Sequence, residues 1–117
     1  MLAVTRLHVP FNPHGCERCV KTPNMCKGKI VADLIKVHTP TTIVYGGDGG
    51  NDFCAACALR PNDFVLPRGG YTLAKKLAQD QTKGPNLVTA TQRLWNDYEE
   101  FGNTIAELSK QQQQNKL

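Results

Sequence analysis

The sequence predicts an α/β fold in which a parallel sheet of three to four strands carries flanking helices. Two observations lead to this expectation. Short apolar segments alternate with segments of helical periodicity along most of the chain. In addition, a glycine-rich turn follows one apolar segment directly, at the kind of position where open α/β sheets place their ligands. Such a thin sheet would leave an edge that is normally paired, so we expect an incomplete domain.

The first half of the chain predicts a strand at residues 2–9, a helix from about residue 24 to residue 37, and a strand at residues 42–45. Asn24 can cap this helix, and the prolines before it and the His38-Thr39-Pro40 stretch after it limit its length. Helical spacing separates an apolar side from a polar side. The apolar side holds Ile30, Val31, Leu34 and Ile35, and the polar side holds Lys29, Asp33 and Lys36.

Lys27 falls on the apolar side of the predicted helix, at its amino end. A lysine that points inward near the edge of a sheet needs an anion as its partner. The alternative is that its side chain runs along the apolar stripe and reaches water. Lys29 lies on the opposite side and is expected to be solvated.

The second half of the chain predicts three helices, at residues 51–59, 71–79 and 96–109, and two strands, at residues 63–66 and 87–89. In the last helix four residues recur at three- and four-residue spacing and predict a docking stripe, namely Tyr98, Phe101, Ile105 and Leu108. We expect residues 1–109 to form the domain part and residues 110–117 to form a glutamine-rich disordered tail.

The composition is that of a globular chain of at most one small domain, with 117 residues, 40% hydrophobic residues and 21% charged residues. The net charge of +4 is mild and its basic residues are scattered, so we expect no nucleic-acid partner. No apolar run approaches the ~20 residues of a membrane span, and the amino end lacks the core of a signal peptide. We therefore expect a cytoplasmic, reducing setting and no membrane association.

The glycine-rich turn, Gly46-Gly47-Asp48-Gly49-Gly50-Asn51-Asp52, carries two carboxylates four residues apart. Its Gly-x-Gly-x-x-Asp pattern does not complete a dinucleotide fingerprint, and two negative charges would repel a pyrophosphate. An EF-hand would need ligands at alternating positions and a terminal Glu. A Mg²⁺ site for phosphate chemistry fits better, because one or two carboxylates usually hold that ion together with phosphate oxygens and water. A tight turn with acidic residues for solubility is the alternative.

The five cysteines include two Cys-x-x-Cys pairs, Cys16/Cys19 and Cys54/Cys57, which 34 residues separate. The two pairs could build a four-thiolate zinc site, or His14, Cys16, Cys19 and Cys26 could form a local one. Plain buried or surface thiols are favoured over both. A thioredoxin-type redox site is disfavoured, because neither pair lies where a strand enters the amino end of a helix.

Four stretches in this order resemble one group of haloacid dehalogenase-like phosphatases, the phosphoethanolamine/phosphocholine and pyridoxal-phosphate phosphatases. They are His14-Gly15-Cys16-Glu17-Arg18-Cys19, Asn24-Met25-Cys26-Lys27-Gly28-Lys29, residues 44–54 and Pro67-Arg68-Gly69-Gly70-Tyr71, and the resemblance covers residues 5–109. It implies a Rossmann-like sheet and a Mg²⁺-dependent phosphatase. It further implies that Asp48 and Asp52 ligate Mg²⁺, that Lys27 and Asp52 are catalytic, and that Lys27, Gly49 and Asn51 bind phosphate.

The chain departs from this family in one respect. The superfamily attacks phosphate with an Asp in a D-x-D-x-T/S stretch, and none of the six Asp residues here lies in that pattern. The chain therefore resembles the C-terminal half of such a domain, whose partner would be the missing N-terminal half or a second copy. We expect a small phosphate monoester as the substrate of the whole enzyme, such as phosphoethanolamine, phosphocholine or pyridoxal phosphate, and no turnover by this chain alone. The alternative function is a non-catalytic zinc- or partner-binding module that uses the cysteines.

Overall fold

The computed structural model describes residues 26–114, and within them a three-stranded parallel sheet forms the centre. The strands are β1 (Val44–Gly47), β2 (Phe64–Pro67) and β3 (Thr91–Gln92), in the order β1-β2-β3. Val44 pairs with Phe64, and Phe64 pairs with Thr91. The predicted fold class is thus confirmed. Residues 26–114 contain three strands and four helices, α1 (Lys27–His38), α2 (Asp52–Ala58), α3 (Thr72–Lys83) and α4 (Tyr98–Gln114).

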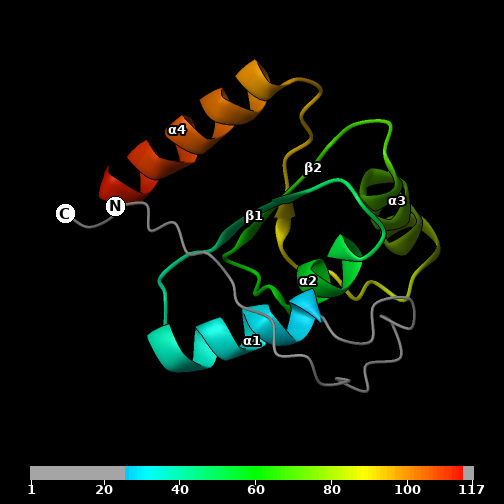
Figure 1. Ribbon diagram of the computed structural model, residues 1–117, viewed down its shortest axis with the longest axis horizontal. Coiled ribbons are helices and arrows are strands. Elements are labelled where there is room, and N and C mark those ends of the chain that lie inside the picture. Colours follow the sequence, from blue (N-terminus) through cyan, green and yellow to red (C-terminus); the bar gives the residue numbers. More distant parts are fainter. Residues whose placement is uncertain (1–25, 115–117) are drawn as a thin grey trace.

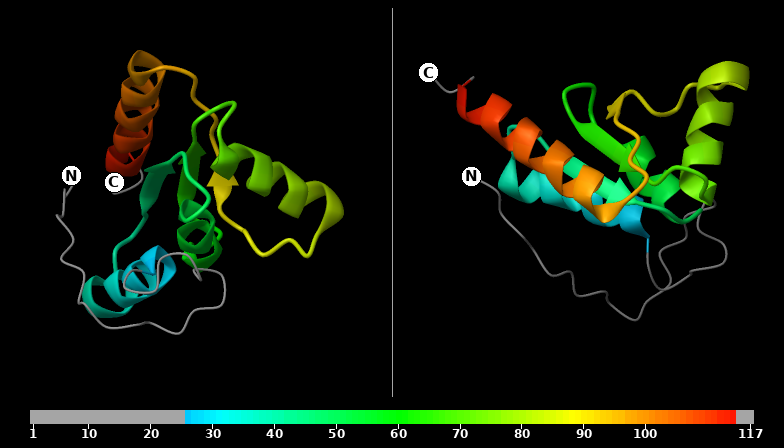
Figure 2. Two further views of the ribbon diagram at one scale, coloured as in Figure 1. Left: turned by 45° about the vertical axis from the view of Figure 1, so that its right-hand side comes forward. Right: turned by 90° about the horizontal axis from the view of Figure 1, so that it is seen from above.

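Side chains of β2 alternate between the two faces of the sheet, as the pleat of a strand requires. Val65 joins a large apolar cluster with side chains of α1, α2 and α3, whereas Phe64 and Leu66 pack with α4. The helices therefore form two layers. α1 and α2 lie on one side of the sheet and α4 lies on the other, as Figures 1 and 2 show.

Helix α1 has the orientation that its sequence predicts. Val31 is buried, Leu34 and Ile35 pack against the large cluster, and Lys29 is exposed. The first described residue, Cys26, is the N-cap, because its side chain accepts a hydrogen bond from the Lys29 N–H. The predicted cap, Asn24, lies outside the described residues, as does the predicted strand at residues 2–9.

Strand β3 lies further along the chain than predicted, at residues 91–92 instead of residues 87–89. The reason is Asp80, a buried residue of α3, whose carboxylate accepts hydrogen bonds from the Leu87 N–H at 2.9 Å and the Val88 N–H at 3.1 Å. These donors are therefore not available to a neighbouring strand. Val88 and Ala90 still pack in the core, so the prediction that this segment contributes to the core was correct.

Helix α4 is longer than predicted, because it continues to Gln114. It thus enters the segment assigned to the tail, and glutamine is a fair helix former. The stripe docks through Phe101, Ile105 and Leu108, but Tyr98 is 72% exposed and was wrongly included. Tyr98 is the first residue of the helix, and its ring lies 5.7 Å from that of Trp95. None of the helices within residues 26–114 is long and apolar enough to cross a bilayer.

Candidate active site

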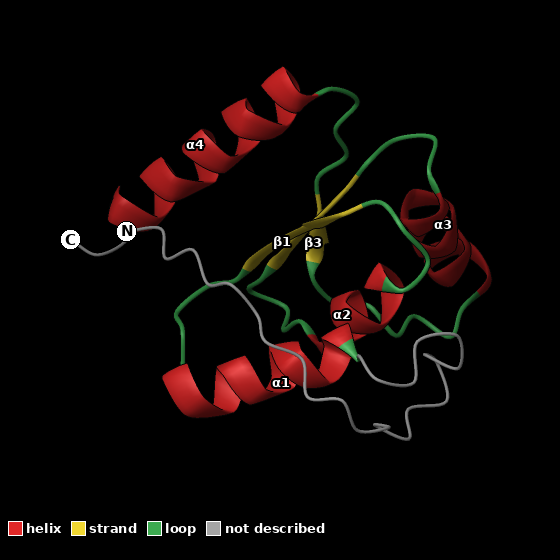
Figure 3. Ribbon diagram, in the orientation of Figure 1, coloured by secondary structure: helices red, strands yellow, loops and turns green. Residues whose placement is uncertain are grey.

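A cleft of about 520 Å³ opens beside β1, at the carboxyl end of the strand. Helix α1 forms one wall through Lys27, and α4 and the segment before it form the other through Trp95 and Tyr98. The floor is formed by residues of β1 and by Asp48 and Asp52. Figure 3 shows the loop that joins β1 to α2. The predicted residues Lys27, Asp48 and Asp52 all line this cleft.

Asp52 is the centre of the site and is only 4% exposed. Its Oδ1 accepts hydrogen bonds from Lys27 Nζ at 2.7 Å and from the Tyr45 hydroxyl at 2.7 Å. Its Oδ2 accepts hydrogen bonds from the backbone N–H groups of Asp48 at 3.1 Å and Gly49 at 3.0 Å. One carboxylate therefore ties together α1, β1 and the glycine-rich loop.

The local sequence explains how Asp52 reaches these four donors. It is the first residue of α2, where the helix dipole favours a negative charge. Gly47 permits the close approach, because a Cβ atom at that position would lie 2.5 Å from Asp52 Oδ2. A side chain at residue 47 would thus push the carboxylate out of the loop.

The charge state of the site follows from these contacts. Burial alone would raise the pKa of Asp52, but hydrogen bonds from Lys27, Tyr45 and the Gly49 N–H outweigh burial and hold the pKa below its usual range. Burial and the neighbouring Asp52 carboxylate raise the pKa of Tyr45 above its usual range. At neutral pH Asp52 is therefore a carboxylate and Tyr45 is an uncharged phenol.

The other predicted residues are arranged around this centre. Asp48 is exposed, and its carboxylate makes no side-chain hydrogen bond within the described part of the chain. Asn51 is exposed at the beginning of α2 and makes no capping hydrogen bond with its side chain. Gly49 already donates its N–H to Asp52. Lys27 turns inward to the carboxylate and is not directed along the stripe into water.

An arginine stacked among aromatic rings lies at the rim of the site. The guanidinium carbon of Arg68, which follows β2, is 4.5 Å from the ring centre of Tyr71, 5.3 Å from that of Trp95 and 5.2 Å from that of Tyr98. Its Nε is buried and has no hydrogen-bond partner within residues 26–114. Trp95 is fixed by a hydrogen bond from its indole N–H to the carbonyl of Leu66, at 2.8 Å. The rim of the site thus carries a positive charge that is stabilised by cation–π contacts with the aromatic rings.

With this geometry in place, the chain can be compared with known proteins. A family model described as "Putative Phosphatase" matches residues 3–109. The chain belongs to this phosphatase family.

Individual relatives carry more specific names. Inorganic pyrophosphatase 2 of Arabidopsis thaliana is 36% identical over 81% of this chain and 33% of its own length. Human phosphoethanolamine/phosphocholine phosphatase is 35% identical over 74% of this chain and 33% of its own length. Mouse pyridoxal phosphate phosphatase PHOSPHO2 is 42% identical over 59% of this chain and 30% of its own length. The chain therefore spans about a third of the length of the curated relatives it matches. No solved structure gives a significant match.

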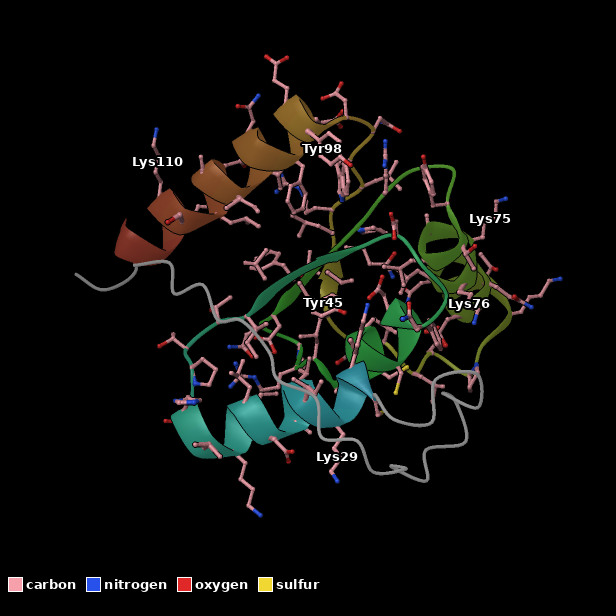
Figure 4. The ribbon with its side chains drawn as sticks, viewed as in Figure 1. Lys29, Tyr45, Lys75, Lys76, Tyr98 and Lys110 are labelled. Carbon is pink, nitrogen blue, oxygen red and sulfur yellow. The ribbon has the colours of Figure 1, made fainter. Side chains whose placement is uncertain are left out.

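Sequence reasoning missed two features of this candidate site. The hydroxyl of Tyr45 contacts Asp52, and the only available signal was that both residues flank the same glycine-rich turn. Figure 4 shows Tyr45 reaching from β1 toward α2, whereas Lys29 points away from the molecule. The aromatic rings around Arg68 come from the loop after β2 and from residues near the start of α4. These residues are far apart along the chain, so no local sequence pattern indicated that they meet.

Proposed function

We propose that this chain supplies the Mg²⁺- and phosphate-binding part of a phosphatase that hydrolyses a small phosphate monoester. The observation that carries this proposal is the placement of the Lys27 ammonium and the Asp48 carboxylate in one cleft at the carboxyl end of β1, organised by Asp52. The names of the relatives make phosphoethanolamine, phosphocholine and pyridoxal phosphate the first substrates to test, and inorganic pyrophosphate a further one.

The two acidic residues suit different tasks. Asp48 fits a Mg²⁺ ligand, because its oxygens are exposed and Mg²⁺ is usually held by one or two carboxylates together with water and phosphate oxygens. When bound, Mg²⁺ would neutralise negative charge on the phosphoryl oxygens. Asp52 was also expected to ligate the ion, but protein donors occupy both of its oxygens. It suits the positioning of Lys27 and of the loop.

Lys27 is suited to hold the phosphoryl group. An ammonium group has three donors, and Asp52 uses one of them, so Lys27 can keep this contact and still donate to a phosphate oxygen. Its positive charge would stabilise the negative charge that phosphoryl transfer builds up. Of the two other expected phosphate contacts, Asn51 has an exposed side chain, whereas the Gly49 N–H is already committed to Asp52.

The attacking carboxylate is the part that these 117 residues lack, because they contain no D-x-D-x-T/S stretch. We place it in a further segment of protein that completes the cleft beside β1, either an N-terminal half of the domain or a second copy of the chain. The purified chain should then bind phosphate without turning over an ester.

Titration calorimetry with inorganic phosphate in the presence of Mg²⁺ tests this function. Lys27→Met should weaken phosphate binding by about tenfold or more, as expected for a charge-assisted hydrogen bond. Lys29→Met is the matched control, because it removes the same charge from the exposed side of the same helix. Asp48→Asn should abolish the dependence of binding on Mg²⁺, whereas Asp33→Asn on the exposed side of α1 should not.

Two results would contradict the proposal. Equal phosphate affinity of the Lys27→Met and Lys29→Met variants would remove the phosphate-binding role. Mg²⁺-dependent hydrolysis of p-nitrophenyl phosphate by the purified chain, lost in Asp48→Asn, would show that its nucleophile lies within these 117 residues.

A further inference from the structure

A positively charged side chain at the carboxyl end of the sheet has no anionic partner in the described part of the chain. Arg68 directly follows β2, and its backbone N–H donates to the Gly47 carbonyl at 3.1 Å, so it lies next to the last residue of β1. Its guanidinium group has five N–H donors. Among residues 26–114, no carboxylate forms an ion pair with this group, and its Nε is buried without a hydrogen-bond partner. Charges that are partly buried are normally paired, so an acceptor is missing here.

Aromatic rings hold this guanidinium group in place. Its carbon lies within 4.5–5.3 Å of the ring centres of Tyr71, Trp95 and Tyr98. Trp95 is 6% exposed and is fixed to the Leu66 carbonyl, so it provides a rigid support. Cation–π contacts stabilise the charge, but a ring face is a weak acceptor that does not replace an oxygen lone pair. The group is therefore held in position with hydrogen-bonding capacity to spare.

Two of these rings connect Arg68 to the cleft. Trp95 and Tyr98 line the cleft of about 520 Å³ from the side of α4, and Lys27 lines it from the side of α1. Tyr98 is 72% exposed and Tyr71 is 45% exposed, so the surroundings of Arg68 are accessible to a ligand. A substrate whose phosphoryl group contacts Lys27 would thus extend its leaving group toward the rings and the guanidinium group.

We propose that Arg68 selects substrates whose leaving group carries a carboxylate or a second phosphate, a role that depends on the phosphate site proposed for Lys27. A guanidinium group suits these oxyanions because its planar fork donates two parallel hydrogen bonds to them. Arg68 as a whole is partly exposed, which leaves its terminal N–H groups for the ligand. Arg68 would bind the part of the substrate that leaves, while Lys27 binds the part that is transferred. Of the substrates named above, inorganic pyrophosphate has such a leaving group.

A cationic leaving group should be disfavoured for the same reason. Clusters of aromatic rings often bind quaternary ammonium groups, such as that of phosphocholine. Here the Arg68 guanidinium group already lies over all three rings, and its charge would repel a second cation. The charge of the leaving group therefore separates the candidate substrates, in favour of anionic leaving groups and against choline and ethanolamine.

Binding of matched phosphate esters to the purified chain tests this selection. 3-Phosphoglycerate and glycerol 3-phosphate share a carbon skeleton, but the first has a carboxylate where the second has a hydroxymethyl group. Titration calorimetry in the presence of Mg²⁺ should show that 3-phosphoglycerate binds about tenfold more tightly, as expected for a charge-assisted bidentate contact. Phosphocholine should bind more weakly than either ester. Equal affinities of the wild-type chain for the two esters would overturn the inference, whether or not any variant folds.

Variants at two arginines assign the preference to Arg68. Arg68→Gln should bring the two affinities to the same value and should raise the affinity for phosphocholine severalfold, a gain that a damaged fold would not produce. Arg93→Gln is the matched control and should keep the wild-type ratio, because Arg93 pairs with Glu107 at the surface. A preference for 3-phosphoglycerate that survives Arg68→Gln would overturn the role of Arg68, and so would an unchanged affinity for phosphocholine.

Lys27→Met separates this inference from the proposed function. It should weaken the binding of both esters and leave their ratio unchanged, because Lys27 contacts the phosphoryl group that they share. Binding that depends on Lys27 but shows no preference between the esters would contradict only the role of Arg68. Binding that does not depend on Lys27 would contradict the proposed function itself.

Discussion

Replacing Lys27 by methionine should expose how much the Lys27–Asp52 ion pair contributes to stability. The substitution removes the ammonium group that lies 2.7 Å from Asp52 Oδ1 and keeps a side chain of similar length. Asp52 then remains 4% exposed with a negative charge and one fewer donor. A structural role of the pair therefore predicts a loss of stability.

The expected loss is about 1–2 kcal/mol at pH 7. A hydrogen bond to a charged group contributes about 1.5–3 kcal/mol net. Here the Lys27 side chain is 30% exposed, so water weakens the interaction, and Asp52 keeps its three donors from Tyr45, Asp48 and Gly49. The loss should therefore fall below the ~3–5 kcal/mol that follows when a fully buried pair is broken.

Urea unfolding followed by tryptophan fluorescence measures this loss. Trp95 is the chain's one tryptophan and is 6% exposed, so its emission reports on unfolding. The same experiment should be repeated at lower pH. Because the folded pKa of Asp52 lies below its usual value, its stabilising contribution is complete above the unfolded pKa of about 4 and is lost as pH falls through the folded pKa.

The difference between wild type and variant should therefore be largest at neutral pH and should shrink in acid. Lys29→Met, on the exposed side of the same helix, should change stability by less than about 0.5 kcal/mol. Equal stability of the Lys27→Met and Lys29→Met variants at pH 7 would refute the reasoning. A difference that persists in acid after the folded Asp52 carboxylate has been protonated would show that the loss comes from packing and not from charge.

Two further substitutions test how the layers are held together. Asp63→Asn should lower the free energy of unfolding by about 3 kcal/mol in the same assay. The buried carboxylate accepts hydrogen bonds from the Ile43 N–H and from the backbone and side chain of Arg60. An amide would turn a donor toward these donors. An unchanged midpoint would contradict this account. Gly46→Ala should lower the free energy of unfolding by about 1–2 kcal/mol, because its Cβ would lie 2.7 Å from the ring of Phe101 on α4. It should also alter Trp95 emission, because the ring centres of Phe101 and Trp95 lie 4.7 Å apart. Unaltered stability and emission would mean that α4 docks more loosely than the structure shows.

The sequence predicted the order of the elements within residues 26–114 and the inward side of α1, because both depend on local periodicity. Val31 and Lys27 share one side of a helix wherever that helix lies. The position of β3 could not be predicted in this way. Leu87 and Val88 have the character of strand residues, but the Asp80 carboxylate takes their N–H groups, and that contact joins residues seven and eight positions apart.

The candidate site was predicted in its residue types and less well in its internal contacts. A carboxylate in the first turn of a helix after a glycine-rich loop is visible in the sequence, and so is a lysine on an apolar stripe. The particular acid that Lys27 meets depends on how α1 packs against α2, which no local pattern specifies. The same holds for Cys26 and Cys54, which come together only because Gly28 lets the two helices approach closely.

Because Asp52 makes all of its contacts within the protein, substitutions at residues 52 and 48 should have different effects in a saturation mutagenesis screen. Residue 52 has its carboxylate oxygens committed to four donors, so even glutamate should lower the amount of folded protein in a cell. Residue 48 has an exposed side chain, so most substitutions there should leave cellular abundance intact and affect only what the chain binds. Two acids four positions apart should thus give opposite mutational profiles.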